Sequence, residues 1–361
     1  MLFGALAALY AVLVDQWVIP ERPTPVPYTQ YLLQSTVGVA GRVVIESGSN
    51  SKYGIDVPTL VRHWQRPVVI VANQASYPLK HKLFNLKNHL EPGDTLILPL
   101  EWHYYVEGRD LAEVYTTRVA DENLSLEFYF NALPILDKLE FVFTQFPFSS
   151  ALSVLLEPRS YAELDDADVR RIDRFLRQLK NFDNASFGGN LKETSDSIDV
   201  VAAAMKCDQY VHTLAIPAGK AVLSDVFLSN LELLRVLADD GVSVYFMWPA
   251  VADREESACY ALAQSRVHIE AFAADVVEAV TASGFRFVGD IEESHFGSQC
   301  FLDTYYHLTH SCAVKRTQAM LRAFEREGIS LPRSAASQET LVERSTEFGM
   351  ALKRRYAAER L

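Results

Sequence analysis

The sequence predicts a three-layer α/β/α domain with a mainly parallel sheet and a helical insertion. Runs of β-branched residues occur without polar interruption, which is typical of strands buried on both faces of a sheet. Helix-like segments separate these runs at regular intervals, as in a doubly wound sheet. The chain has 361 residues, of which 49% are hydrophobic and 22% charged, so it is long enough to bury a large core.

The first half of the chain holds three strand-and-helix repeats, which follow a short helix expected at residues 28–37. Asp56 and Pro58 predict the start of the first intervening helix, because Asp is a favoured N-cap and Pro suits the first turn. A second helix is expected at residues 79–90. Strands are predicted at residues 42–46, 68–72 and 95–99.

The second half resumes this alternation after an interruption. Residues 107–197 are rich in Phe and Tyr, and we expect a helical insertion over one side of the sheet, with its aromatic residues in the core. The main domain spans residues 41–330, and the tail at 331–361 is predicted to be a separate, exposed helix. The remaining elements are predicted as helix 228–237, strand 242–249, helix 269–283, strand 285–288 and helix 309–326.

The first 40 residues are predicted to precede the main domain. Residues 1–19 are mostly apolar and are interrupted by Asp15. We favour a membrane anchor, although so short an apolar run also suits a buried N-terminal helix. Four prolines follow within residues 20–27, which is typical of a stiff extended spacer. A stalk is therefore expected over residues 20–40, holding the domain away from a membrane surface.

Charge and cysteine content exclude several classes of protein. The net charge is −12 and no basic cluster offsets it, so we expect no nucleic-acid partner. The four cysteines form no CxxC pair, which argues against a zinc ribbon or a dithiol redox site. His103 and His295 lack the spacing of metal ligands. The sequence therefore predicts neither a metal nor a cofactor.

The turn after the first strand is the first candidate for chemistry. At the carboxyl end of a parallel strand, a serine can face the crevice where active sites form, while its N–H joins an oxyanion hole. The alternative is a loop that binds phosphate or only turns the chain, and no full phosphate-binding motif is present. The turn consists of Glu46-Ser47-Gly48-Ser49-Asn50-Ser51.

The second candidate precedes the last helix of the main domain. Asp303 lies four residues before His307. A nucleophilic serine needs a general base, and that base needs an acceptor that fixes its tautomer. The alternative is that Asp303 caps a helix and His307 is a structural histidine. Because the two motifs lie at opposite ends of the predicted domain, they favour a site that only the fold assembles.

Four stretches together resemble the SGNH hydrolase superfamily, in particular the branch of DltD and the alginate O-acetylation proteins. The resemblance covers about residues 42–321 without the insertion, and it implies a flavodoxin-like α/β/α fold. The stretches are Gly48-Ser49-Asn50 with Tyr53-Gly54-Ile55-Asp56, Val71-Ala72-Asn73-Gln74-Ala75, Pro92-Gly93-Asp94 with Leu98-Pro99-Leu100-Glu101-Trp102, and Phe301 to Leu308 with Arg316-Thr317.

The resemblance implies a role for each matching residue. Ser49 is the nucleophile, His307 the base and Asp303 its orienting partner. The oxyanion donors are the backbone N–H groups of Ser49 and Ala75 and, as a further candidate, the side-chain amide of Asn73. Ala75 stands where the family usually has Gly, and the family's third-block Asn has no clear match, which leaves the role of Asn73 open.

Three points remain open at the level of sequence. Glu101 suits either an acid that lines the site or a structural carboxylate at the sheet edge. Ser47 and Ser51 are rival nucleophiles, and Gly48 before Ser49 favours the middle serine. Cys300 and Cys312, on either side of the Asp303–His307 turn, suit a disulfide in an oxidising compartment or two buried thiols.

The expected function is transfer or removal of an acyl group, most simply acetyl, through an acyl-serine intermediate. The expected partners are an envelope or exported polysaccharide and a membrane acyl-donor protein. The expected location is the cell envelope, with the catalytic domain outside the cytoplasm in a periplasmic position. The alternative is a non-catalytic carbohydrate-binding or assembly protein on the same fold, because a fold does not fix a function.

Overall fold

The structure is a computed structural model, which describes most of the predicted main domain. The leader (residues 1–19), the Pro-rich residues 20–27 and the insertion (residues 107–197) lie outside the described residues, except for residues 10, 135–136 and 143. The described residues are 28–72, 79–106, 222–253, 263–302 and 306–359, with the isolated residues 10, 75, 135–136, 143 and 304.

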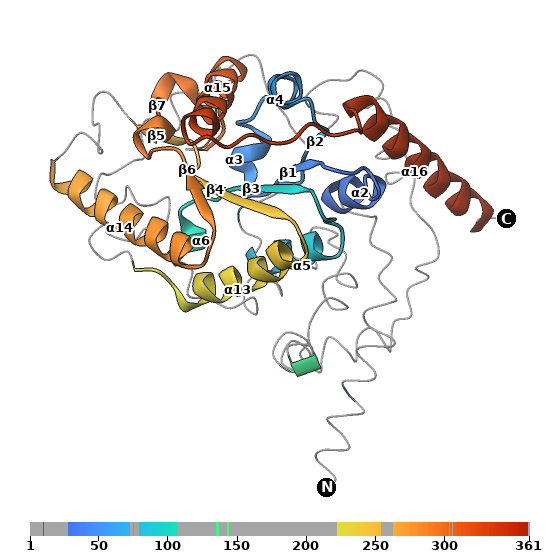
Figure 1. The fold of residues 1–361 in the computed structure, drawn as a ribbon, viewed down its shortest axis with the longest axis horizontal. Helices are drawn as coiled ribbons and strands as arrows, with labels where there is room; N and C mark the ends of the chain where they lie inside the picture. Colours follow the sequence, from blue (N-terminus) through green and yellow to red (C-terminus); the bar gives the residue numbers. More distant parts are fainter. Residues whose placement is uncertain are drawn as a thin grey trace, which may run out of the picture.

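A five-stranded parallel sheet forms the centre of the molecule, in the order β2-β1-β3-β4-β6 (Figure 1). This confirms the predicted three-layer fold class. The order reverses between β1 and β3, which is the place where flavodoxin-like sheets bind their ligands. The strands are β1 (Val43–Ile45), β2 (Val68–Ile70), β3 (Thr95–Pro99), β4 (Ser243–Met247) and β6 (Arg286–Val288).

Helices cover both faces of this sheet, which is why every residue of β1, β2 and β3 is buried. Helices α5, α13 and α14 lie on one side, and α4 and α15 lie on the other (Figure 1). The helices are α4 (Val57–Trp64), α5 (Leu79–Lys87), α13 (Asp225–Asp239), α14 (Ala263–Ala282) and α15 (His310–Arg326), with the short α3 (Ser49–Lys52) and α6 (His103–Val106).

Local signals place the helix starts. The Asp56 side chain accepts a hydrogen bond from the Thr59 N–H at 3.1 Å and caps α4, with Pro58 in the first turn, as predicted. Ser224 caps α13 in the same way through the Phe227 N–H. Each cap satisfies a backbone donor that the helix cannot satisfy internally.

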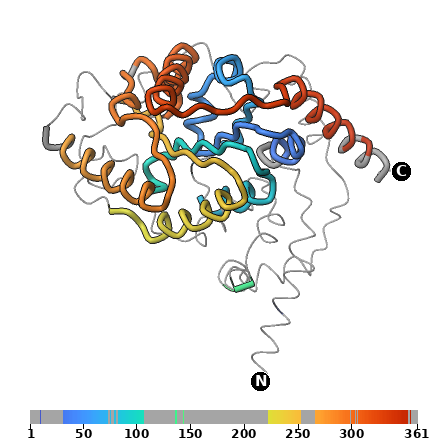
Figure 2. Tube along the Cα trace, viewed as in Figure 1, coloured from blue at the N-terminus to red at the C-terminus, as the bar shows by residue number. Residues whose placement is uncertain are grey.

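The C-terminal helix α16 (Gln338–Glu359) is present. The sequence predicts that this helix is separate from the domain, but its first half packs against the domain. It packs against α2 (Tyr28–Ser35), so the two ends of the described chain lie side by side (Figure 2). The Gln338 amide also exchanges two hydrogen bonds with the backbone of Val68, at 2.8 and 3.0 Å. Gln338 therefore covers the edge strand β2, and α2 belongs to the folded domain rather than to a spacer.

A second, two-stranded parallel sheet was not predicted. It pairs β5 (Val251–Asp253) with β7 (His295–Gly297). Along the chain, β7 lies between two short 3₁₀ helices, η5 (Glu292–Ser294) and η6 (Ser298–Cys300). β5 reads Val-Ala-Asp and β7 reads His-Phe-Gly, so neither has the uninterrupted β-branched run that predicted β1 and β2. This small sheet packs beside the start of α15 and leads into the His307 turn.

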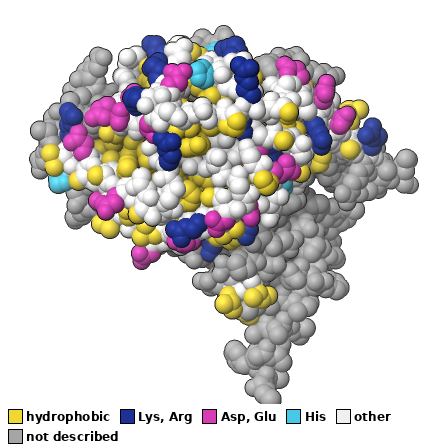
Figure 3. Space-filling view, in the orientation of Figure 1, with side chains coloured by type: hydrophobic (Ala, Val, Ile, Leu, Met, Phe, Trp, Pro, Cys, Tyr) yellow, Lys and Arg dark blue, Asp and Glu magenta, His cyan; other side chains and the backbone are white. Residues whose placement is uncertain are grey.

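Charged side chains of both signs are interspersed with apolar ones on the face in Figure 3. The described residues on this face present no continuous basic patch of the kind that tracks a phosphate backbone.

Candidate active site

The serine turn and Glu101 lie together where the strand order reverses. Ser47 to Ser51 follow β1 directly, and Glu101 follows β3, the neighbour of β1 in the sheet. Because parallel strands end at the same edge, the fold itself brings these segments together. Glu101 is fully buried, and its carboxylate accepts hydrogen bonds from the Gly48 N–H at 2.7 Å and the Asn50 N–H at 3.1 Å.

The three serines of the turn differ in accessibility. Ser47 and Ser51 are fully buried, and their hydroxyl groups bond to each other at 2.6 Å. Ser49 is partly exposed at the start of α3, and its hydroxyl bonds to no group among the described residues. Of the three, Ser49 alone combines access with an uncommitted hydroxyl.

Asn50 is held from two sides, by β3 and by α15. Its side-chain amide donates to the Pro99 carbonyl at 2.9 Å. Arg316 of α15 donates to the Asn50 backbone oxygen at 3.0 Å and to its Oδ1 at 2.7 Å. Burial lowers the pKa of Arg316 to about 10, against the opposing effect of Glu101. Arg316 thus braces the serine turn, a contact that no local sequence signal predicts.

Two buried carboxylates and two buried cations lie beneath the turn. Lys82 of α5 contacts Glu46 at 3.1 Å and donates to the Ser47 carbonyl at 2.8 Å. Burial raises the pKa of Glu46 to about 7, and the nearby Glu101 adds to the rise while Lys82 opposes it. With Arg316, the cluster carries balanced charge when Glu46 is ionised.

Tyr53 connects the His307 segment to the helical turn of Ser49. The Tyr53 N–H donates to the Ser49 carbonyl at 3.0 Å, and the Leu308 N–H donates to the Tyr53 carbonyl at 3.1 Å. The rings of Tyr53 and His307 lie 4.2 Å apart, centroid to centroid. The structure therefore brings the predicted nucleophile and the predicted base into one region. Asp303 lies outside the described residues.

The predicted oxyanion segment also meets the serine turn. A Cβ atom placed on Gly48 would overlap the Glu101 carboxylate and lie 2.7 Å from the Ala75 Cα. Only glycine fits at this close approach of two backbones, whatever its dihedral angles. Ala75 is thus in direct contact with the turn, whereas Asn73 lies outside the described residues.

A disulfide fastens the His307 loop. Cys300 and Cys312 are bonded, with their Cα atoms 5.5 Å apart, so the structure has the first of the two states that the sequence left open. The loop between them is closed further by hydrogen bonds from the Leu302 N–H to the His307 carbonyl at 2.8 Å and from the Thr309 N–H to the Cys300 carbonyl at 2.8 Å.

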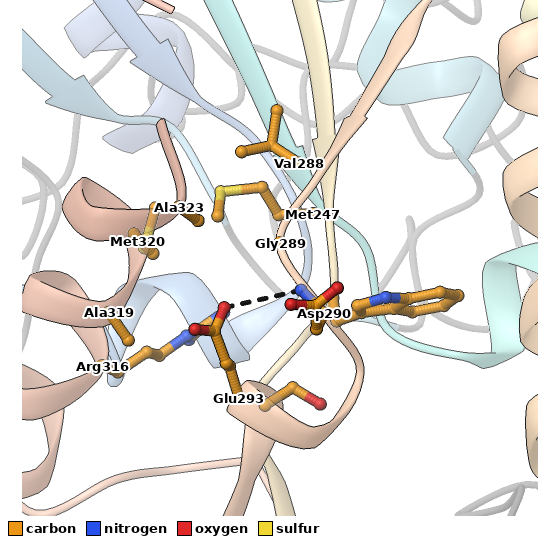
Figure 4. A pocket seen from close by; sticks show the side chains of 11 residues that line it. Met247, Val288, Gly289, Asp290, Glu293, Arg316, Ala319, Met320 and Ala323 are labelled. Carbon is orange, nitrogen blue, oxygen red and sulfur yellow. Dashed lines mark hydrogen bonds between the residues drawn. The ribbon is translucent and has the colours of Figure 1, made fainter. Parts of the chain in front are cut away.

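A small cavity of about 30 Å³ lies at the carboxyl ends of β4 and β6. Figure 4 shows Arg316 from α15 beside it, with Glu293 and Asp290 from the segment after β6. A cavity of this size holds water rather than a sugar. Arg316 therefore lies between this cavity and the serine turn.

Metal-ligand clusters and membrane-spanning helices were sought among the described residues. Within it, no group of three or more His, Cys, Asp or Glu side chains is arranged to hold a metal ion. None of the described helices has both the length and the hydropathy that a membrane span requires.

The fold and the site together define an α/β/α protein in which the strand order reverses beside a partly exposed serine, whose hydroxyl has no partner among the described residues. No known family model matches the chain, and no curated protein matches it with significant similarity.

Proposed function

We propose that the protein is a serine-dependent O-acyltransferase or carbohydrate esterase of SGNH type that acts on an envelope or exported polysaccharide. The observation that carries the proposal is the contrast within the serine turn. Ser47 and Ser51 satisfy each other in the core, whereas the partly exposed Ser49 keeps its hydroxyl free of described partners beside the His307 loop.

The reaction is an acyl exchange in two steps. The Ser49 oxygen attacks the ester carbonyl carbon, and His307 accepts the serine proton. The resulting oxyanion accepts hydrogen bonds from the backbone N–H groups of Ser49 and Ala75. The donor alkoxide leaves with the proton from His307, and the acyl group remains on Ser49. A sugar hydroxyl or water then attacks the acyl carbonyl carbon and gives its proton to His307, whose tautomer Asp303 fixes. The bond from the acyl carbon to the Ser49 oxygen breaks, Ser49 regains the proton from His307, and the new ester or free acid leaves.

Labelling with a fluorophosphonate probe tests the nucleophile. The unmodified protein should be labelled and should release acetate from acetylated glycans, whereas Ser49→Ala should be unlabelled and lose about 10⁴-fold or more in turnover. The matched control is Ser47→Ala, which removes a buried hydroxyl of the same turn and should still be labelled. Wild-type labelling of Ser49→Ala would refute the assignment, and glycan binding without any labelling would favour the non-catalytic alternative.

We further propose that the domain lies outside the cytoplasm, attached through its N-terminal segment. The disulfide supports this location, because such bonds persist in oxidising compartments. A fusion of alkaline phosphatase to the C-terminus should be active in intact cells. An inactive phosphatase fusion, together with a fluorescent cytoplasmic fusion, would exclude this location.

A further inference from the structure

Glu101 holds the serine turn by the two N–H groups on either side of Ser49. One carboxylate oxygen accepts from Gly48 and the other from Asn50, at 2.7 and 3.1 Å. The Ser49 N–H between them donates to no group among the described residues. Because both flanking donors are already satisfied, the turn presents one uncommitted N–H at the position of the proposed nucleophile.

His103, two residues further along, holds the second backbone segment. Its Nε2 atom lies 2.6 Å from the Ala75 carbonyl oxygen. A carbonyl oxygen only accepts, so Nε2 carries the proton. Burial lowers the pKa of His103, which favours the neutral imidazole with this single donor in place. The backbone at Ala75 is thus anchored from the same segment that anchors the serine turn.

Gly48 brings the two anchored segments into contact. The absence of a side chain there lets Ala75 approach until a Cβ on Gly48 would lie 2.7 Å from the Ala75 Cα and overlap the Glu101 carboxylate. A close approach of this kind is useful only if both backbones keep a fixed separation. Glu101 and His103 act on the two sides of that contact.

We propose that Glu101 and His103 are positioning residues that clamp the two backbone segments of the oxyanion hole. The inference rests on the proposed function, since it assigns an oxyanion to this place. Glu101 orients the turn so that the Ser49 N–H faces the reacting carbonyl, and His103 fixes the segment of Ala75 opposite. Neither residue touches the substrate.

The test measures acylation separately from substrate binding, with p-nitrophenyl acetate as the probe and the burst of p-nitrophenol as the readout. Glu101→Gln keeps the shape but turns one acceptor into a donor that faces an N–H, and we expect kcat to fall about 100-fold with KM unchanged. His103→Phe removes the donor and should lower kcat about 10-fold. His103→Gln restores an N–H at the same reach and should recover most of that loss.

Controls separate a positioning role from a stability effect. Asp94→Asn disrupts a buried ion pair at the opposite end of the strands and should lower Tm while the folded protein keeps its kcat. If Glu101→Gln does not fold, the His103 pair of variants carries the test alone. Wild-type acylation by folded His103→Phe, or failure of His103→Gln to exceed it, would overturn the clamp.

Ser49→Ala, measured in parallel, distinguishes the two levels of inference. A burst that survives in Ser49→Ala would refute the proposed function and the clamp with it. An inactive Ser49→Ala beside fully active, folded Glu101→Gln and His103→Phe would overturn the clamp alone.

Discussion

The two ends of the central strands both bury charge, but they use it differently. At the amino end, Arg42 and Asp94 are fully buried and contact each other at 2.6 Å. Arg42 also donates to the Thr36 hydroxyl at 2.8 Å and to the His89 carbonyl at 2.6 Å. Asp94 further accepts from the Glu91 N–H at 3.1 Å. Arg42 and Asp94 therefore bind each other first, and their remaining bonds join them to one hydroxyl and to nearby backbone.

At the carboxyl end, most hydrogen bonds of the buried charged side chains go to backbone N–H and carbonyl groups. Glu101 binds two N–H groups, Lys82 binds the Ser47 carbonyl, and Arg316 binds the Asn50 carbonyl. Some polar groups stay uncommitted among the described residues, including the hydroxyl of Tyr105, which is fully buried.

The difference indicates that the two ends of the strands use buried charge for different purposes. A saturated ion pair stabilises or specifies the fold, and removing one partner leaves an uncompensated charge. A set of charges that fixes backbone beside the partly exposed Ser49 instead suits the active site that we propose there. This matches the general placement of active sites at the carboxyl ends of parallel strands.

The largest expected effect is on the chemistry at the carboxyl end. His307→Ala should lower acyl turnover by about 10⁴-fold or more, because an unassisted serine hydroxyl is a weak nucleophile. Its Tm should stay close to that of the unmodified protein, since the ring is only partly buried. Steady-state kinetics and thermal unfolding measure the two quantities. Turnover that falls less than 10-fold would remove His307 from the mechanism.

The amino end should respond in the opposite way. Arg42→Met leaves Asp94 buried without its partner and should cost about 3–5 kcal/mol of unfolding free energy. Turnover by the folded fraction should not change. Urea unfolding, with kinetics below the transition, measures both. A large loss of kcat in folded Arg42→Met would show that the two ends are coupled and would break the comparison.

A smaller, pH-dependent effect should sharpen the comparison. The pKa of Glu46 is raised to about 7 in the folded protein, whereas an unfolded chain has a Glu pKa of about 4.3. Between these values the folded state binds more protons than the unfolded state, so the contribution of Glu46 to stability falls as the pH rises.

Glu46→Gln removes this titration. Its Tm relative to the unmodified protein should therefore rise between pH 5 and pH 8, by about 2 °C or more. A Tm difference for Glu46→Gln that does not vary with pH would refute the raised pKa.

The parts of the fold that were predictable from the sequence are those that a short local pattern of residues specifies. Uninterrupted apolar runs identified β1, β2 and β3, and the cap at Asp56 identified the start of α4. The docking of α16 was not predictable, because it depends on Gln338 reaching an edge strand 270 residues away. A polar side chain gives no sign of so distant a partner.

The site was predictable in its residue types but not in its geometry. The turn after β1 predicts a serine nucleophile, and Gly48 favours Ser49 within it; the structure adds that Ser49 is partly exposed whereas Ser47 and Ser51 are buried. Glu101 was left open between two roles, and its bonds to Gly48 and Asn50 show that it braces the turn from within the core. His103 was considered only as a metal ligand, and its contact with Ala75 has no signal in spacing.

The bond between Arg316 and Asn50 has a consequence for the order in which the molecule assembles. The two residues are 266 positions apart along the chain, so this contact closes one of the largest loops in the protein and must wait for α15 to emerge. All five strands of the sheet are complete by Val288. The sheet can therefore collapse while the serine turn still lacks its far brace, and non-local contacts of this kind form late. In pulsed hydrogen exchange during refolding, the amides of α15, the helix that carries Arg316, should gain protection after the strand amides, so that reactivity arises only in a finished chain.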